Sequence, residues 1–147
     1  MRVEDVAEIR GRIGRLTPSD ARVWGAMSCH QMVCHLADAF GCPLGEREVA
    51  AVKRPPIPLP IYKWLALRAP MKWPRGVPTP PEMNQLVGGT PPVEFASDVA
   101  QLLVQMERFV VSSGPWSPHP VFGMMTKDEW MRWGYLHTDH HLRQFGR

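Results

Sequence analysis

The chain has 147 residues, of which 44% are apolar and 21% are charged, as is ordinary for one globular domain. No run of about 18 or more uncharged apolar residues occurs, so the sequence predicts no membrane-spanning helix. The net charge of +3 is mild and no nucleic-acid-binding motif is present, which argues against a nucleic-acid-binding protein.

The first residues and the cysteines bear on the compartment. The opening MRVEDVAEIR contains acids and lacks the apolar core of a secretory signal, so we expect a cytoplasmic protein. The cysteines are Cys29, Cys34 and Cys42, an odd number without a C-x-x-C pair, which favours a reducing compartment over a disulfide framework. Cys34 and Cys42 are predicted to be small buried apolar residues.

Two helices are predicted in the first third of the chain. Apolar residues recur at helical spacing over residues 3–16, and the turn-forming residues 17–20 end this first helix. A second helix opens at Ser28, because Ser28 and Gln31 have the spacing of a capping box, in which each side chain bonds the other's backbone N–H. This helix is predicted to end between residues 41 and 45.

A proline-rich crossover of about 45 residues follows, with eleven of the 16 prolines between residues 55 and 92. Its longest stretch without a breaker, residues 60–69, predicts one short helix. No acid lies between Glu48 and Glu82, whereas the following cations do: Lys53, Arg54, Lys63, Arg68, Lys72 and Arg75. This segment is either a solvated basic connector or a surface that closes over an anionic ligand.

Two longer helices complete the chain. The third is predicted over residues 92–113, and Gly114 with Pro115 ends it. The fourth opens with a second capping box, Thr126 with Glu129, and runs to about residue 145. The predicted fold class is therefore all-α: a four-helix bundle with a long Pro-rich crossover between the second and third helices, in one domain over residues 1–147.

The fourth helix carries imidazoles on its predicted core face. On a helical wheel, one stripe holds Trp130, Trp133, His137, His141 and Gln144. Two histidines at positions i and i+4 project side by side and can bind one divalent ion. His35 of the second helix is the best candidate for a third ligand. Three histidines would leave positions open for water and substrate, as in catalytic metal sites.

Several polar residues near this cluster have open roles. Asp38 shares a face with His35 and either orients its ring or is a plain exposed acid. Gln144 either bonds a ligand histidine or metal-bound water, or is a polar group at the helix end. His140 is expected to support the site or to contact a second subunit.

The remaining histidines and the tryptophans have simpler interpretations. His30 and His119 are predicted to be surface residues. Trp24, Trp130 and Trp133 are predicted to lie in the core, with one or two of them beside the pocket.

Two segments together resemble a known superfamily. The stretch WGAMSCHQMVCHLADAF and the C-terminal FGMMTKDEWMRWGYLHTDHHLRQFG are similar to the DinB/YfiT-like four-helix bundles, and to a branch that ends in H-x-x-H-H-x-x-Q-F-G. The resemblance covers nearly the whole chain, including its Pro-rich crossover.

The resemblance implies a metal site and a class of function. Its members usually hold zinc or nickel through one histidine of the second helix and two of the fourth, which correspond to His35, His137 and His141. Its members include thiol S-transferases, isomerases and metal-dependent hydrolases, and many form dimers. We therefore expect a homodimeric metal-dependent hydrolase or thiol S-transferase that acts on an anionic or thiol small molecule, without nucleic-acid or membrane partners. The alternative is a non-catalytic helical bundle that binds a metal or a small molecule.

Overall fold

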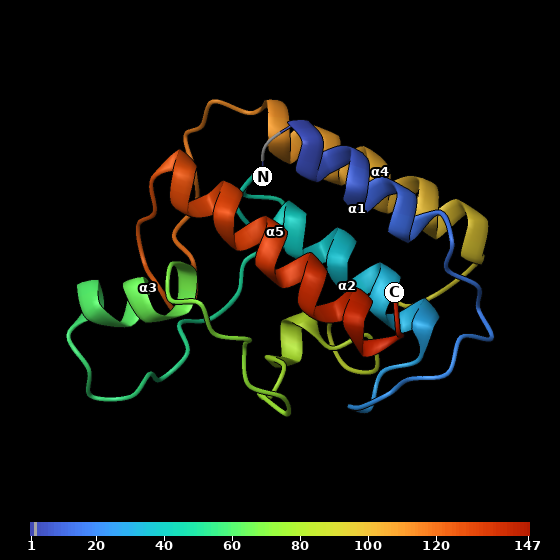
Figure 1. Ribbon diagram of the computed structural model, residues 1–147, viewed down its shortest axis with the longest axis horizontal. Coiled ribbons are helices and arrows are strands. Elements are labelled where there is room, and N and C mark those ends of the chain that lie inside the picture. The colour runs from blue at the N-terminus through green and yellow to red at the C-terminus, as the bar shows by residue number, and fades with distance from the viewer. Residues whose placement is uncertain (2) are drawn as a thin grey trace.

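The regular structure of the described chain is helical. The computed structural model describes Met1, the backbone of Val3 and residues 4–147. Its elements in chain order are α1 (Val3–Ile13), α2 (Cys29–Gly41), α3 (Leu59–Leu67), the 3-10 helix η1 (Pro81–Met83), α4 (Phe95–Val111) and α5 (Lys127–Gln144) (Figure 1). These residues form no β-strand, which confirms the predicted all-α class.

The two predicted capping boxes are present. Ser28 Oγ accepts from the Gln31 N–H at 3.1 Å, and Gln31 Oε1 accepts from the Ser28 N–H at 2.8 Å. Thr126 and Glu129 make the same reciprocal pair at the start of α5. Because these caps satisfy backbone donors that have no partner within the helix, both helices that carry the candidate ligands start where the sequence predicts.

Two other helix boundaries differ from the prediction. The helix predicted over residues 92–113 begins only at Phe95, because the Glu94 carboxylate accepts from the N–H groups of Ala96 and Ser97 and caps the helix there. The first helix ends at Ile13, and tighter i→i+3 hydrogen bonds carry the chain on to Leu16. Leu16 is nevertheless buried, so its position in the apolar stripe was predicted correctly.

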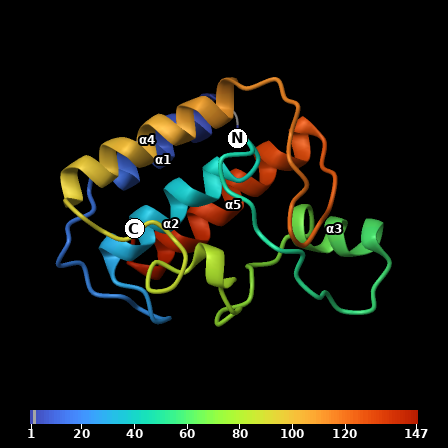
Figure 2. The same cartoon turned by 180° about the vertical axis from the view of Figure 1, so that it is seen from behind.

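The four longer helices pack around one apolar core. Helix α2 packs against α4 and α5, α1 packs against α5, and an ion pair between Arg10 and Glu107 joins α1 to α4 (Figures 1 and 2). The largest fully buried side chains are Trp130, Phe40, Phe109, Ile9, Ile13, Met32, Leu36, Leu67, Leu102, Met106, Leu142 and Val33. None of the helices in the described chain is both long and apolar enough to cross a bilayer.

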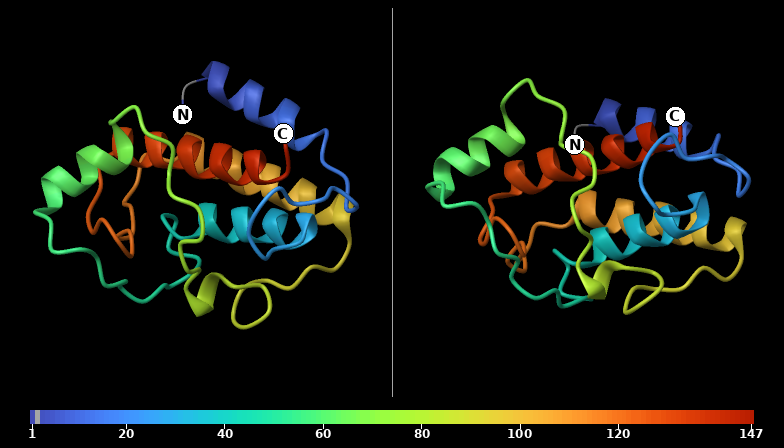
Figure 3. Two further views of the ribbon diagram at one scale, coloured as in Figure 1. Left: turned by 60° about the horizontal axis from the view of Figure 1, so that its bottom comes forward. Right: turned by 90° about the horizontal axis from the view of Figure 1, so that it is seen from below.

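The crossover between α2 and α4 passes over α5 before it returns to α2. Helix α3 packs against α5, where Lys63 forms an ion pair with Glu129 and Arg132 Nε donates to the carbonyl of Leu67. The chain after α3 then crosses α5 and reaches η1, which packs beside α2 (Figure 3). This path brings Trp73 next to His137 of α5 and brings η1 next to His35 of α2.

Candidate metal centre

The rings of His35, His137 and His141 converge between α2 and α5. Their centroids are 5.3 Å apart for His35 and His137, and 4.7 Å apart for the other two pairs. Each ring offers one nitrogen as a ligand atom, and these three nitrogens lie within 4.8 Å of one another. His35 is buried, while His137 and His141 are partly exposed, so the cluster is accessible from one side.

Hydrogen bonds on the outer side fix the tautomers of two rings. His35 Nδ1 lies 3.0 Å from the carbonyl oxygen of Met83, which can only accept, so Nδ1 carries the proton. His141 Nδ1 lies 3.0 Å from Gln144 Oε1, and Gln144 Nε2 donates to the carbonyl of Trp24 at 2.9 Å. Since that second bond fixes the amide orientation, His141 Nδ1 is also the donor. Both rings therefore present an unprotonated Nε2.

The third ring is held by stacking. His137 lies against Trp133 with an interplanar angle of 19° and a centroid distance of 4.7 Å. Its Nε2 is 3.4 Å from Nε2 of His35. Zinc–nitrogen bonds of about 2.0–2.1 Å at a tetrahedral angle require ligand atoms about 3.3 Å apart, so this spacing fits a shared ion.

The three imidazoles are kept neutral. Burial is the largest cause that lowers the pKa of all three rings, and repulsion from the neighbouring histidines adds to it at His137 and His141, whose pKa values lie well below the ordinary value. At neutral pH the cluster is a set of uncharged bases without a carboxylate among them. This is the protonation state in which histidine binds a metal ion.

Aromatic side chains from two loops lie beside the cluster. The ring of Trp73 is 6.2 Å from that of His137 and 6.3 Å from that of His140. Trp24 packs edge-on against His140 at 5.9 Å, and the guanidinium of Arg75 lies 4.1 Å above the Trp24 ring. A cation of the crossover is thereby held next to the histidines.

Comparison with known proteins assigns a family to this chain. Residues 1–147 match the model of a family described as protein of unknown function (DUF1569). The chain belongs to the DUF1569 family. No curated protein and no solved structure is significantly similar to it.

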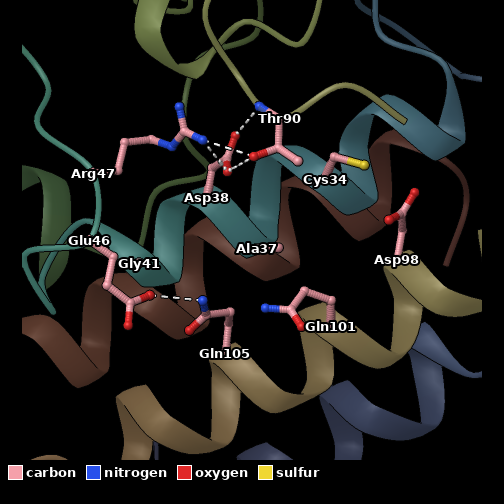
Figure 4. A pocket seen from close by; sticks show the side chains of 10 residues that line it. All are labelled: Cys34, Ala37, Asp38, Gly41, Glu46, Arg47, Thr90, Asp98, Gln101 and Gln105. Carbon is pink, nitrogen blue, oxygen red and sulfur yellow. Dashed lines mark hydrogen bonds and ion pairs between the residues drawn. The ribbon is translucent and has the colours of Figure 1, made fainter. Parts of the chain in front are cut away.

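In this DUF1569 chain, Asp38 supports the site differently from the prediction. It does not bond His35, whose outer acceptor is the Met83 carbonyl. Asp38 is buried and accepts from Thr90 N–H and Oγ1 and from Gln85 Nε2, and it forms an ion pair with Arg47 (Figure 4). Asp38 therefore anchors Gln85 and Thr90 in the segment that follows η1, and η1 itself ends at Met83, whose carbonyl is the acceptor for His35. Sequence spacing could not reveal a backbone carbonyl as that acceptor.

Gln144 and His140 occupy the neighbourhood of the cluster in different ways. Gln144 is buried and bonds His141, one of the two roles left open by the sequence. His140 packs against Trp24, Trp73 and His141, and its buried Nδ1 has no partner among the described residues. His140 is thus the nearest further imidazole on the accessible side.

The crossover cations lie in different surroundings. Lys63 donates to the carbonyl of Met124 and pairs with Glu129, so its ammonium group belongs to the start of α5. Arg68, Lys72 and Arg75 are exposed. The two interpretations of the basic segment, a solvated connector or a surface that closes over an anionic ligand, stay predictions. Within it, the ring of Trp73 lies beside His137 and the guanidinium of Arg75 lies over the Trp24 ring.

Two other histidines are not the surface residues that the sequence suggested. His119 is buried against Trp130 and Trp133, and its Nδ1 accepts from the N–H groups of Val121 and Phe122. Burial lowers its pKa to about 3. His30 is partly buried and pairs with Asp98 of α4. The prediction for His119 was wrong because Trp130 and Trp133 of α5 cover its ring, and the prediction for His30 missed its partner Asp98, which is 68 positions away in the sequence.

Proposed function

We propose that the chain is a metal-dependent enzyme whose divalent ion, zinc or nickel, is bound by His35, His137 and His141. The observation that carries the proposal is the convergence of three neutral imidazoles at the spacing of a shared ion. The unprotonated Nε2 atoms of His35 and His141 face the same point as the ring of His137, and a cation there would bind one nitrogen of each ring. The outer bonds of Met83 and Gln144 match the supporting contacts of metal-binding histidines.

We further propose that α1, α2, α4 and α5 are the four helices of a DinB/YfiT-like bundle forming a single domain, with α3 and η1 carried by the crossover. The support is the resemblance of the two histidine segments and the packing of these helices around one core. A homodimer and a cytoplasmic location remain predictions, and light scattering of the purified protein tests the first.

The proposed reaction class is hydrolysis or thiol S-transfer. A divalent ion held by three histidines with an open position supplies acid activation of water or of a thiol, which serves either reaction. His140, whose pKa is lowered by burial and by nearby arginines, is a neutral base at the edge of the site and can accept a proton from substrate. Arg75 supplies a positive charge there, which suits an anionic small-molecule substrate.

The test combines chelation with two variants on the same helix. The metal-loaded protein is screened against esters, amides and thiol-conjugation substrates. His137→Ala and metal removal are expected to abolish turnover, while Tyr135→Phe, which alters only the side of α5 that bonds Glu8 of α1, retains it. Turnover that survives both chelation and His137→Ala would refute the proposal.

The second candidate is a non-catalytic bundle that binds a metal or a small molecule. It is favoured by the way Trp73, Trp24 and Arg75 crowd the accessible side of the cluster. Absence of turnover across the screen, together with metal loss that greatly lowers the free energy of unfolding, would support this candidate.

A further inference from the structure

A second cluster of metal-ligating side chains lies between α2 and α4. His30 and Cys34 are one turn apart on α2, and Asp98 is in the first turn of α4. One ligand atom from each lies within 4.8 Å of the others, and His30 Nε2 is 2.7 Å from Asp98 Oδ2. The cluster shares no residue with the three-histidine site.

Burial and charge set the chemistry of this cluster. Cys34 is 2% exposed, and the side chains of His30 and Asp98 are 20% and 19% exposed. Burial works against ionisation of Asp98, but hydrogen bonds from the Val93 N–H and from His30 hold its pKa below the ordinary value. The carboxylate is therefore negative at neutral pH.

The thiol is a poor nucleophile in this setting. Burial, and then the adjacent Asp98 carboxylate, raise the pKa of Cys34 to about 12. A Cys–His–Asp arrangement built for nucleophilic catalysis needs the opposite shift. A cation placed between the sulfur and the carboxylate would instead compensate the charge of a thiolate.

A groove gives access to the cluster. It has a volume of about 220 Å³, lies between α2 and α4, and is lined in part by Cys34, Asp98 and Gln101. In Figure 4 the sulfur of Cys34 and the carboxylate of Asp98 lie at the same end of this groove. An ion held there would keep a position open toward the groove.

We propose that His30, Cys34 and Asp98 form a second divalent-metal site, which binds a borderline-soft ion such as Zn²⁺ and joins the start of α2 to the start of α4. One nitrogen, one sulfur and one oxygen donor are ligands that zinc accepts together. The contact between His30 and Asp98 widens from 2.7 Å to about 3.3 Å when both atoms bind one ion, a change that side-chain rotation supplies. Without an ion, the same contact is an ion pair or hydrogen bond between the two helices.

Cobalt substitution tests this site separately from the three-histidine cluster. Only a thiolate ligand gives Co²⁺ a sulfur-to-metal charge-transfer band in the near ultraviolet, and His35, His137 and His141 offer no thiolate. The Co²⁺-loaded wild type and His137→Ala are both expected to show the band. Cys34→Ser is expected to lose it and to bind one fewer ion per chain.

Two more variants keep the result interpretable. Cys42→Ser is the matched control, because this half-buried thiol contacts Met83 and lies outside the cluster, so the band is retained. Asp98→Asn can still accept the hydrogen bond from Val93, so it is expected to fold and to bind Co²⁺ more weakly. Circular dichroism checks that each variant is folded.

A wild-type protein without the charge-transfer band overturns the proposal, as does a band that persists in folded Cys34→Ser. Because His137→Ala alters only the three-histidine cluster, the cobalt experiment still tests the second site if the proposed function is refuted.

Discussion

The amide of Gln144 connects the candidate metal centre to the loop that carries Trp24. Its Oε1 accepts from His141 and its Nε2 donates to the Trp24 carbonyl, while its own backbone carbonyl accepts from Val23 at 2.7 Å. Gln144→Met keeps the length and helix propensity of this buried side chain but removes both amide bonds. The substitution therefore tests whether orientation of His141 matters for metal binding.

The expected loss of zinc affinity in Gln144→Met follows from the hydrogen-bond donor that the substitution leaves unpaired. Trp24 is partly exposed, so water can replace Gln144 at its carbonyl. The Nδ1–H of His141, by contrast, is left without an acceptor, because the ring cannot turn toward water while its Nε2 binds a metal. Leaving such a donor unpaired costs about 1–3 kcal/mol. Loss of a supporting contact to a metal-binding histidine weakens affinity by about 10–100-fold, which is about 1.4–2.7 kcal/mol, so the two routes agree.

The assay is zinc competition against a chromophoric chelator at pH 7.5, a condition chosen so that the histidines are neutral. Signal from the second cluster is removed by working in the Cys34→Ser background. Gln105→Met is the matched control, because Gln105 is a half-buried glutamine of α4 whose side chain bonds Glu46 and Arg108 and not a residue of the histidine cluster. A folded Gln144→Met that binds zinc with the Kd of Gln105→Met would refute the argument that this amide supports the site.

Three further predictions use other measurements. Gly25→Ala is expected to weaken zinc binding as Gln144→Met does, because Gly25 has φ +83° and a Cβ there would lie 2.2 Å from Gln144 Nε2; unchanged affinity would contradict this. Gly134→Ala should lower the free energy of urea unfolding by up to about 2 kcal/mol, because the new Cβ lies 2.8 Å from Phe109 and the overpacking cost of about 1–3 kcal/mol is reduced by a helix-propensity gain of up to about 1 kcal/mol. A stabilised variant would contradict this. Burial holds the pKa of His119 and of the three candidate ligands below that of histidine in the unfolded chain. The chelator-treated protein should therefore lose stability as the pH falls below about 6.5, by up to about 1.4 kcal/mol per pH unit for each histidine that only the unfolded chain protonates. Unfolding free energies that do not change between pH 7.5 and 5.5 would contradict this prediction.

Local rules of sequence determined much of this protein. The capping boxes at Ser28 and Thr126 set the starts of α2 and α5, since their hydrogen bonds join residues only three positions apart. Helical periodicity placed His137 and His141 on one stripe with Trp133, because 3.6 residues per turn bring positions i and i+4 to one face. The all-α class follows from the same short-range patterns.

Only the tertiary structure decided what those faces meet. It brought the Met83 carbonyl to His35, Trp73 to His137, and Asp98 to Cys34 and His30, across separations that no periodicity encodes. Such contacts depend on how a proline-rich crossover folds back over two helices, which is governed by packing and by long-range hydrogen bonds. For the same reason Asp38, which the sequence associated with His35, instead bonds Gln85 and Thr90 just after η1, the element whose Met83 carbonyl is the acceptor for His35.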